Sequence, residues 1–172
     1  MWIPSNRTNW RKNDWTVGIA LDKNGDICRF ERFQIDWETT TNRIITMIGV
    51  LPALIDSTGV GDPIVERVQK RCVGALGYHF TQPSKQRLME GLAVALGRHE
   101  TSVLIEGDGS APTVHQQELE SFEYEYTRMG VRYSAPEGYN DDAVCSHALA
   151  VMAKSRATVD LDVWHALVGK RA

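Results

Sequence analysis

An Asn-Gly pair at residues 24–25 separates two β-prone runs, and this pattern restricts the start of the chain to a β-hairpin. The runs "WTVGIALD" and "ICRFERFQI" are rich in Val, Ile, Phe and Trp, and Asn-Gly readily adopts the positive φ angles of a tight turn. Beyond residue 35, short apolar runs alternate with segments whose apolar residues recur at helical spacing. A hairpin followed by alternating helices and strands predicts an α/β fold with a mixed β-sheet and helices on its faces.

The individual elements follow from the same periodicities. Helices are expected at residues 37–48, 63–72, 83–99, 115–122 and 140–154, with a separate short helix around Trp164 and Leu167. Strands are expected at residues 50–56, 76–80, 102–106, 124–127 and 131–135. The threonines at 39–41 are candidate caps for the first helix, and Pro63 suits the first position of the second.

Composition narrows the class of protein. The chain has 172 residues, of which 42% are hydrophobic and 24% charged, so we expect one globular domain spanning residues 1–172. No apolar run reaches the roughly 18 residues of a membrane span, and the N-terminus lacks an apolar signal region, which favours a cytoplasmic protein without membrane partners. The formal net charge of −3 gives no global attraction to nucleic acid, so any such binding depends on a local basic patch.

Three aspartates are the candidate chemical groups. Asp56 ends the apolar run "VLPALID", and Asp141 with Asp142 opens the apolar helix "AVCSHALAVM". Functional groups gather at the carboxyl ends of strands in open α/β sheets, and a helix N-terminus favours negative charge. Three carboxylates in one cleft repel one another unless a cation neutralises them. Carboxylate oxygens suit Mg²⁺ or Mn²⁺, and two such ions can assist in-line hydrolysis of a phosphodiester.

A purely structural interpretation stays open for each stretch. An aspartate before an apolar helix is commonly an N-cap, which explains Asn140 or Asp141 without any metal. The stretch "DSTGVGD" that begins at Asp56 is also ordinary turn chemistry, and it lacks the G-x-x-x-x-G-K-[ST] pattern of a phosphate-binding loop. The two stretches are more specific together, in this order and on these elements, than either is alone.

A family resemblance joins these stretches. The segments "NDWTVGIALDKNGD", "LIDSTGVGDPIVERV", "PSKQRLMEGLAVAL", "QELESFEYE" and "YSAPEGYNDDAVCSHALAVM" resemble the C-terminal nuclease domain of tailed-phage terminase large subunits. The resemblance is strongest over residues 14–153. It implies a ribonuclease H-like fold, with a central mixed β-sheet flanked by helices on both faces. It also implies two-metal endonuclease cleavage of double-stranded concatemeric DNA during phage genome packaging, in the cytoplasm of a bacterial host.

The resemblance also assigns expected roles to residues. Asp56, Asp141 and Asp142 match metal-binding aspartates, and Asp14 matches an acidic position that lies near the metals in some members. The expected cofactors are two Mg²⁺ or Mn²⁺ ions. The expected partners are double-stranded DNA, the terminase small subunit, the portal and an ATPase motor. That motor, which precedes the nuclease domain in the family, is not encoded in these residues.

Basic residues supply candidate contacts to DNA phosphates. Lys85 matches a position suited to a phosphate, although a solvated lysine at a helix start is an equally good interpretation. Arg87, Lys12 and Arg11 are further candidates. Most such groups lie on solvated helix faces, but an acidic protein that binds DNA needs some of them to follow the phosphate backbone.

The N-terminus departs from the family pattern. The family has a further metal-binding aspartate at the end of its first strand, and the matching position here is Thr8, or Asn9 with a one-residue shift. The chain is then an inactive form, or Asp14 partly replaces the ligand, or a foreign or truncated segment has replaced the first strand. Two alternative functions follow: a catalytically impaired module that binds DNA or packaging proteins, and a resolvase-like nuclease for branched DNA.

The histidines and aromatic residues favour structural roles. His147 is more readily explained as a surface or core histidine than as a ligand, because the chain has no H-x-x-x-H or H-E-x-x-H pair. The alternating aromatic residues Phe122, Tyr124, Tyr126 and Tyr133 favour core or cross-strand packing over base stacking.

Overall fold

The structure, a computed structural model of the chain, describes residues 15–58, 63–107, 109, 111–128, 130–136 and 138–168. The strands are β1 (Thr16–Leu21), β2 (Ile27–Phe33), β3 (Ala53–Asp56), β4 (Ala75–Tyr78), β5 (Glu123–Thr127) and β6 (Gly130–Ser134). The helices are α1 (Trp37–Ile48), α2 (Pro63–Gln69), α3 (Gln82–Gly97), α4 (Val114–Ser121) and α5 (Asp142–Val168). The candidate residues Asp14, Lys12, Arg11, Asn9 and Thr8 lie outside the described residues.

The predicted α/β class is confirmed. The described strands pair two by two: β1 with β2 and β5 with β6 are antiparallel, whereas β3 and β4 are parallel. The parallel pair is joined through α2, as a parallel connection requires. These pairings are three two-stranded sheets, so the single central sheet that the sequence analysis expected stays a prediction.

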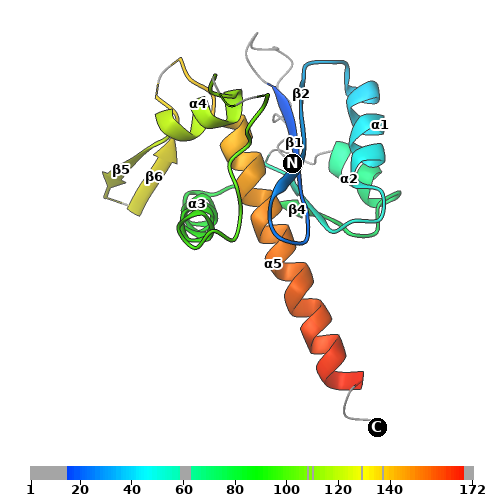
Figure 1. Cartoon of the computed structure of the whole chain (residues 1–172). Coiled ribbons are helices and arrows are strands. Elements are labelled where there is room, and N and C mark those ends of the chain that lie inside the picture. Colours follow the sequence, from blue (N-terminus) through cyan, green and yellow to red (C-terminus); the bar gives the residue numbers. More distant parts are fainter. Residues whose placement is uncertain are drawn as a thin grey trace.

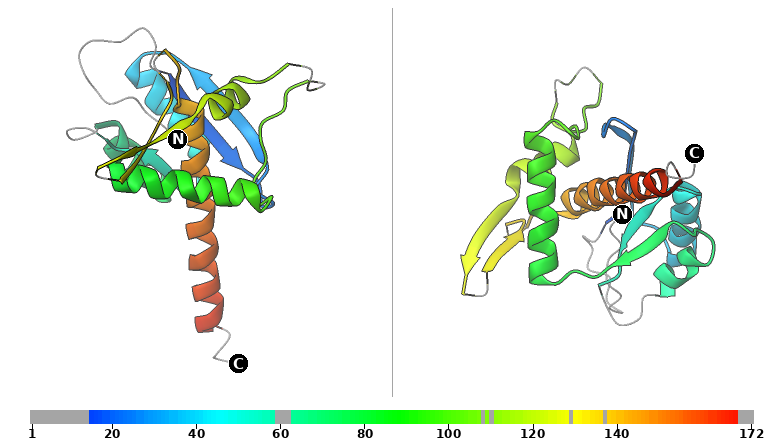
Figure 2. Two further views of the ribbon diagram at one scale, coloured as in Figure 1. Left: turned by 90° about the vertical axis from the view of Figure 1, so that its left-hand side faces the viewer. Right: turned by 90° about the horizontal axis from the view of Figure 1, so that it is seen from below.

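Helix α5 is the element around which the others are arranged (Figure 1). The β1–β2 hairpin, α1 and α2 lie on one side of α5, and α3, α4 and the β5–β6 hairpin lie on the other. Helix α3 runs across α5 rather than alongside it (Figure 2). The buried side chains of Leu54 on β3, Leu88 on α3 and Leu149 on α5 belong to one apolar cluster. The first half of α5 is therefore held by packing on several sides, which fixes the position of its first turn.

The β1–β2 hairpin confirms the predicted turn at Asn-Gly, but of that pair only Gly25 has a positive φ. Gly25 has φ +101°, a conformation that glycine adopts without steric cost. The Asp22 carboxylate accepts hydrogen bonds from the backbone N–H groups of Asn24, Gly25 and Asp26 at 2.8–2.9 Å. The turn is thus stabilised by an aspartate that precedes it.

The β5–β6 hairpin confirms cross-strand packing of its aromatic residues. The Tyr133 ring stacks on Phe122 at a centroid distance of 6.2 Å and contacts Tyr124 at 6.2 Å. Tyr124 and Tyr126 nevertheless remain exposed. Phe122 and Tyr133 thus pack against the apolar cluster around α5, whereas Tyr124 contacts Tyr126 and Tyr133 at the surface.

Two local predictions are wrong. The cap of α1 is Asp36, whose carboxylate accepts the Thr39 N–H at 3.0 Å, whereas Thr41 donates its hydroxyl to the Trp37 carbonyl at 2.7 Å. Residues 102–106 do not form a strand. The N–H of Leu104 donates to His115 Nδ1, and its carbonyl accepts from the Thr113 hydroxyl, so side chains at the start of α4 take the groups that a strand partner would use.

The C-terminal prediction is also corrected. No separate short helix forms around Trp164, because α5 continues without interruption to Val168. The sequence from 142 to 168 contains neither glycine nor proline, so nothing in it stops a helix once it has begun. The last turns of α5 extend beyond the rest of the molecule (Figure 1). Among the described helices, none combines the length and the apolar character that crossing a membrane requires.

Candidate functional site

Asp56 lies at the carboxyl end of β3, as the sequence indicated. Its side chain is buried, and Oδ1 accepts the backbone N–H of Thr58 at 2.7 Å. The Thr58 hydroxyl in turn accepts the Phe80 N–H at 2.8 Å, which ties the chain after β3 to the chain after β4. The ends of the two parallel strands are therefore held together at Asp56.

Asp141 and Asp142 lie at the start of α5. The Asp141 carbonyl accepts the Cys145 N–H at 2.9 Å, which is the first hydrogen bond of the helix. Asp141 is thus the N-cap residue by its backbone, and Asp142 is the first residue within the helix. The Asp142 side chain is buried, whereas that of Asp141 is 23% exposed.

Lys85 forms an ion pair with Asp141. Its Nζ lies 2.7 Å from Asp141 Oδ2, and the two side chains are 25% and 23% exposed. Burial of the ammonium group acts to lower the pKa of Lys85, but the pKa is raised overall by Cys145, by the paired Asp141 and by Asp56. Lys85 is therefore a cation held between the carboxylate of β3 and that of α5. The phosphate contact that the resemblance suggested for it stays a prediction.

Asp142 has a strongly perturbed carboxyl group. Burial, and then the negative charges of Glu118 and Asp141, raise the pKa of Asp142 from 3.8 to about 8. A weak hydrogen bond of 3.4 Å from the Trp15 N–H and the charge of Arg32 oppose this rise. Active sites are places where burial and neighbouring like charges are arranged to shift the pKa of a carboxyl group in this way.

Glu118, on α4, is a residue of this site that the sequence analysis did not single out. Its Oε2 accepts the Ala143 N–H in the first turn of α5 at 2.7 Å, and its Oε1 is buried without a hydrogen-bond partner. The pKa of Glu118 is raised, chiefly by burial. A glutamate within a short helix is ordinary in sequence terms, and only its spacing of three residues from the buried His115 could have indicated an inward face.

Cys145 shows that β3 and α5 share one electrostatic environment. Burial raises the pKa of its thiol well above the usual value, and Asp141, Asp142 and Asp56 raise it further while Lys85 opposes them. Cys145 also packs in the same apolar cluster as Leu54 of β3. Two acidic stretches separated by more than eighty residues of sequence are therefore brought to the same part of the molecule.

The acidic side chains that the structure describes do not by themselves form a complete metal site. No three His, Cys, Asp or Glu side chains in that part of the chain are close enough to hold a metal ion together. Asp141 is instead paired with the Lys85 ammonium group, and the charge of Glu118 acts on Asp142. Arg87, a candidate for DNA contact, is exposed on α3.

The donor chemistry of the site fits a hard divalent cation. All candidate ligands are carboxylate oxygens, which Mg²⁺ and Mn²⁺ prefer. The buried Glu118 Oε1 has an acceptor position that nothing fills, and Lys85 already supplies a positive charge to two of the acids. A bound cation would relieve the mutual repulsion that raises the pKa of these crowded acids.

A neutral histidine pair lies beneath the start of α5. The Leu104 N–H donates to His115 Nδ1 at 3.2 Å, so His115 carries its proton on Nε2 and donates it to His147 Nδ1 at 3.1 Å. His147 Nε2 then faces the Thr101 hydroxyl at 2.8 Å, which donates to the Gly25 carbonyl. Burial lowers the pKa of His115 to about 4 and that of His147 to about 3. His147 is thus a core histidine, one of the two structural roles favoured for it.

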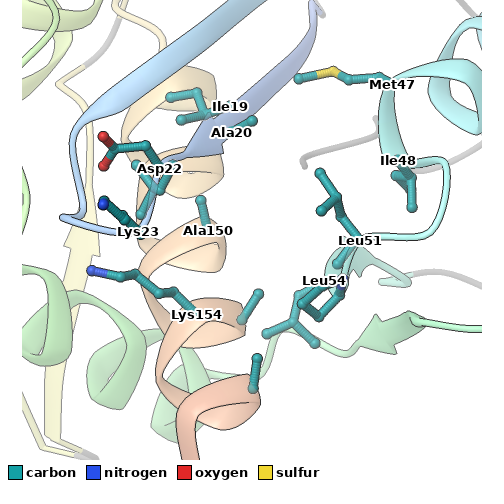
Figure 3. A pocket seen from close by; sticks show the side chains of 15 residues that line it. Ile19, Ala20, Asp22, Lys23, Met47, Ile48, Leu51, Leu54, Ala150 and Lys154 are labelled. Carbon is teal, nitrogen blue, oxygen red and sulfur yellow. The ribbon is translucent and has the colours of Figure 1, made fainter.

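An apolar pocket lies elsewhere in the molecule. It has a volume of about 360 Å³ and is bounded by Ile19 of β1, Leu54 of β3, Ala150 of α5 and Met47 of α1, with Lys154 at its edge (Figure 3). Ala150 is two turns further along α5 than Asp142, and the pocket faces the beginning of β3 rather than its end. The pocket therefore does not belong to the candidate site.

Comparisons with known proteins identify the fold. No protein-family model matches the sequence, and no curated protein matches it at a significant level. The large terminase nuclease of thermophilic phage G20c with bound magnesium is similar in structure, with a TM-score of 0.62 and 23% identity over 81% of this chain and 82% of that chain. Its form with bound cobalt gives a TM-score of 0.61 and 23% identity, over 81% of both chains.

A second phage protein has the same architecture. The large terminase nuclease domain of Thermus phage P74-26 gives a TM-score of 0.58 and 20% identity, over 79% of this chain and 77% of that chain. These comparisons confirm, at the level of fold, the resemblance that the sequence motifs indicated. The chain has the mixed α/β fold of phage large terminase nucleases.

Proposed function

We propose that the chain is a metal-dependent endonuclease domain of the terminase type, with a ribonuclease H-like fold. Its substrate is double-stranded concatemeric DNA, which it cleaves during phage genome packaging. The observation that supports this proposal most is that Asp56 at the end of β3 and Asp141 and Asp142 at the start of α5 all act on the pKa of the buried Cys145 thiol, in a chain with the fold of phage terminase nucleases. The solved large terminase nucleases with bound magnesium and cobalt support the use of a divalent cation.

Each acidic residue has a distinct role in this proposal. Asp56, Asp141 and Asp142 hold Mg²⁺ or Mn²⁺, with Asp14 assisting, and two ions are expected. When bound, such cations lower the pKa of water and stabilise the attacking and leaving oxygens of a phosphodiester. Asp142 is buried with a pKa of about 8, so it gives up a proton when it becomes a ligand. Lys85 keeps the Asp141 carboxylate oriented and neutralised until then.

DNA contacts come from basic groups beside the acids. Arg87 is exposed on α3, the helix whose Lys85 is paired with Asp141 at the acidic start of α5. Arg11 and Lys12 are further candidates. The terminase small subunit, the portal and an ATPase motor region are the proposed partners, and the host cytoplasm is the proposed location.

A second candidate function is a catalytically impaired module that binds DNA or packaging proteins. Thr8 or Asn9 at the position of the family's first metal-binding aspartate favours it, because neither is an anionic ligand.

A resolvase-like preference for branched DNA is distinguished by comparing cleavage of four-way junctions with that of linear duplex.

Cleavage of supercoiled plasmid in Mn²⁺ tests the first proposal. The chain is expected to nick or linearise the plasmid in Mn²⁺ but not in EDTA, and Asp56→Asn and Asp142→Asn are each expected to lose this activity. Asp26→Asn removes an exposed carboxylate from the hairpin turn and is the matched control, with activity unchanged. Equal cleavage by all three variants would exclude the assigned acids. DNA binding without any cleavage would favour the impaired module.

A further inference from the structure

The first turn of α5 has an unusual capping arrangement. A helix begins with backbone N–H groups that lack partners within the helix, and the N-cap side chain normally accepts one of them. Asp141 occupies the N-cap position, because its carbonyl accepts the first helical hydrogen bond from Cys145. Its carboxylate, however, is paired with Lys85 at 2.7 Å. The α5 N-terminus is therefore capped by a residue other than its own N-cap side chain.

Glu118 supplies that cap from α4. Its Oε2 accepts the Ala143 N–H at 2.7 Å, and a hydrogen bond with the Val144 backbone also acts on its carboxyl group. Ala143 and Val144 are the second and third residues of the helix, the positions that an N-cap side chain serves. A carboxylate from the neighbouring helix α4 thus caps α5, and the Asp141 carboxylate pairs with Lys85.

The same face of α4 makes a second polar contact with α5. His115 lies one turn before Glu118, and its Nε2 is 3.1 Å from His147 Nδ1 on α5. Helix α4 is therefore attached to α5 at two points, one at the first turn and one a turn or more further along. Because both Glu118 and His115 are buried, these contacts fix the direction in which α5 begins.

We propose that Glu118 is a positioning residue for the candidate metal site: it caps α5 in place of Asp141, and so keeps Asp141 and Asp142 directed towards the metals. This inference rests on the proposed function. Residues that orient metal ligands without touching the metal typically change metal affinity about 10- to 100-fold when removed. The buried, unpartnered Glu118 Oε1 places further negative charge beside Asp142, in keeping with a site that a cation completes.

The test compares Glu118→Ala, Glu118→Gln and a matched control, Glu120→Ala, which removes an exposed glutamate from the same helix. Mn²⁺ affinity is measured by calorimetry at a temperature where circular dichroism shows every variant to be folded. Glu118→Ala is expected to weaken Mn²⁺ binding about tenfold or more, because Asp141 then turns to cap its own helix. Glu118→Gln, whose amide oxygen still accepts the Ala143 N–H, is expected to stay within a few-fold of the unmodified chain, as is Glu120→Ala.

Two outcomes would overturn the proposal. Unchanged Mn²⁺ affinity in Glu118→Ala would reduce Glu118 to a structural cap. An equal loss in Glu118→Gln and Glu118→Ala would show that the charge matters rather than the hydrogen bond, which is the behaviour of a direct ligand. If Glu118→Ala does not fold, a loss of affinity in Glu118→Gln overturns the proposal and retention supports it.

A metal-free measurement separates this inference from the proposed function. If the unmodified chain binds no Mn²⁺, the proposed function fails, and crystal structures of the metal-free variants decide the role of Glu118. In Glu118→Ala, the Asp141 carboxylate is expected to leave Lys85 and to accept the N–H of Ala143 or Val144, whereas in Glu118→Gln it stays paired with Lys85. An Asp141 carboxylate that stays paired with Lys85 in Glu118→Ala would overturn the proposal without any reference to metal.

Discussion

The Nζ atom of Lys85 on α3 lies 2.7 Å from Oδ2 of Asp141 at the start of α5. This contact joins the helix that crosses α5 to the acidic end of α5, fifty-six residues later in the sequence. Lys85 also interacts with Asp56, so a single ammonium group balances acids from two separate elements. Among the residues that the structure describes, Lys85 is a positive charge that Asp56 and Asp141 share.

Replacement of Lys85 by methionine is expected to lower the stability of the metal-free protein by about 1–2 kcal/mol, because a half-buried carboxylate loses its partner. Added Mn²⁺ should restore more stability to this variant than to the unmodified chain, since the cation then neutralises acids that lack Lys85. Urea denaturation with and without Mn²⁺ measures both effects. Arg87→Met, an exposed change on the same helix, is the control and should alter neither value. A Lys85→Met variant that Mn²⁺ stabilises no more than the unmodified chain would contradict this account.

Replacement of Asp142 by asparagine is expected to abolish cleavage and yet stabilise the metal-free protein. The folded pKa of Asp142, about 8, lies above the unfolded value of 3.8, so this group favours folding below pH 3.8 and loses that contribution as the pH rises towards 8. Asparagine has no such dependence. At pH 7 the gain should be on the order of 2 kcal/mol or more, and it should vanish near pH 4.

Chemical denaturation between pH 4 and pH 8 checks this prediction. Asp26→Asn removes an exposed carboxylate and should show no comparable gain at any pH. An Asp142→Asn variant that is less stable than the unmodified chain at pH 7 would contradict a raised pKa at this position.

The histidine pair predicts acid sensitivity. The folded pKa values of His115 and His147, about 4 and about 3, lie below the usual 6.5. The unfolded chain then binds protons that the folded chain excludes, so stability is complete above pH 6.5 and falls as the pH drops towards 4. The loss should be on the order of 3 kcal/mol for each histidine.

A glutamine at position 147 should make this pH dependence shallower, because one titrating group is gone. The free energy of unfolding is measured at several pH values between 4 and 7, and the slope rather than the absolute stability is compared. His99→Gln, at an exposed histidine, should keep the original slope. A His147→Gln slope equal to that of the unmodified chain would show that His147 is not buried in its neutral form.

Gly25 links the hairpin turn to the histidine pair through its carbonyl, which accepts the Thr101 hydroxyl. Alanine at this position would place its Cβ 1.9 Å from the Glu100 carbonyl oxygen, at a φ of +101°. Gly25→Ala should therefore cost about 2–4 kcal/mol of stability. Gly91→Ala is the contrasting control: nothing lies within 4 Å of its Cβ in α3, so a gain of about 0.5–1 kcal/mol is expected. Thermal denaturation measures the stability of both variants, and equal melting temperatures of Gly25→Ala and Gly91→Ala would contradict this prediction.

Elements with strong local signals could be predicted from the sequence. The Asn-Gly turn, the apolar spacing of α3 and the short apolar run before Asp56 each depend on neighbouring residues, and each matches the structure. The positions of Asp56 at a strand end and of Asp142 in the first turn of a helix could be predicted from the sequence for the same reason.

Features that depend on distant residues could not be predicted in this way. The run at 102–106 has strand propensity, but the His115 and Thr113 side chains take the backbone groups of Leu104. Glu118 caps α5 across twenty-five residues of sequence, and no local pattern marks such a contact. The cap itself was expected from Asn140 or Asp141, whereas the Asp141 side chain is engaged by Lys85.

The central claim is that Asp56 and Asp142 serve one metal site. A double-mutant cycle on Mn²⁺ affinity tests it most directly, using Asp56→Asn, Asp142→Asn and the variant with both changes. If the two acids hold the same ions, each single replacement should weaken Mn²⁺ binding severely. The double variant should then bind Mn²⁺ scarcely more weakly than either single variant, because the effects of coupled positions are not additive. Losses of affinity that simply add, or a single variant that binds Mn²⁺ as the unmodified chain does, would contradict a shared site.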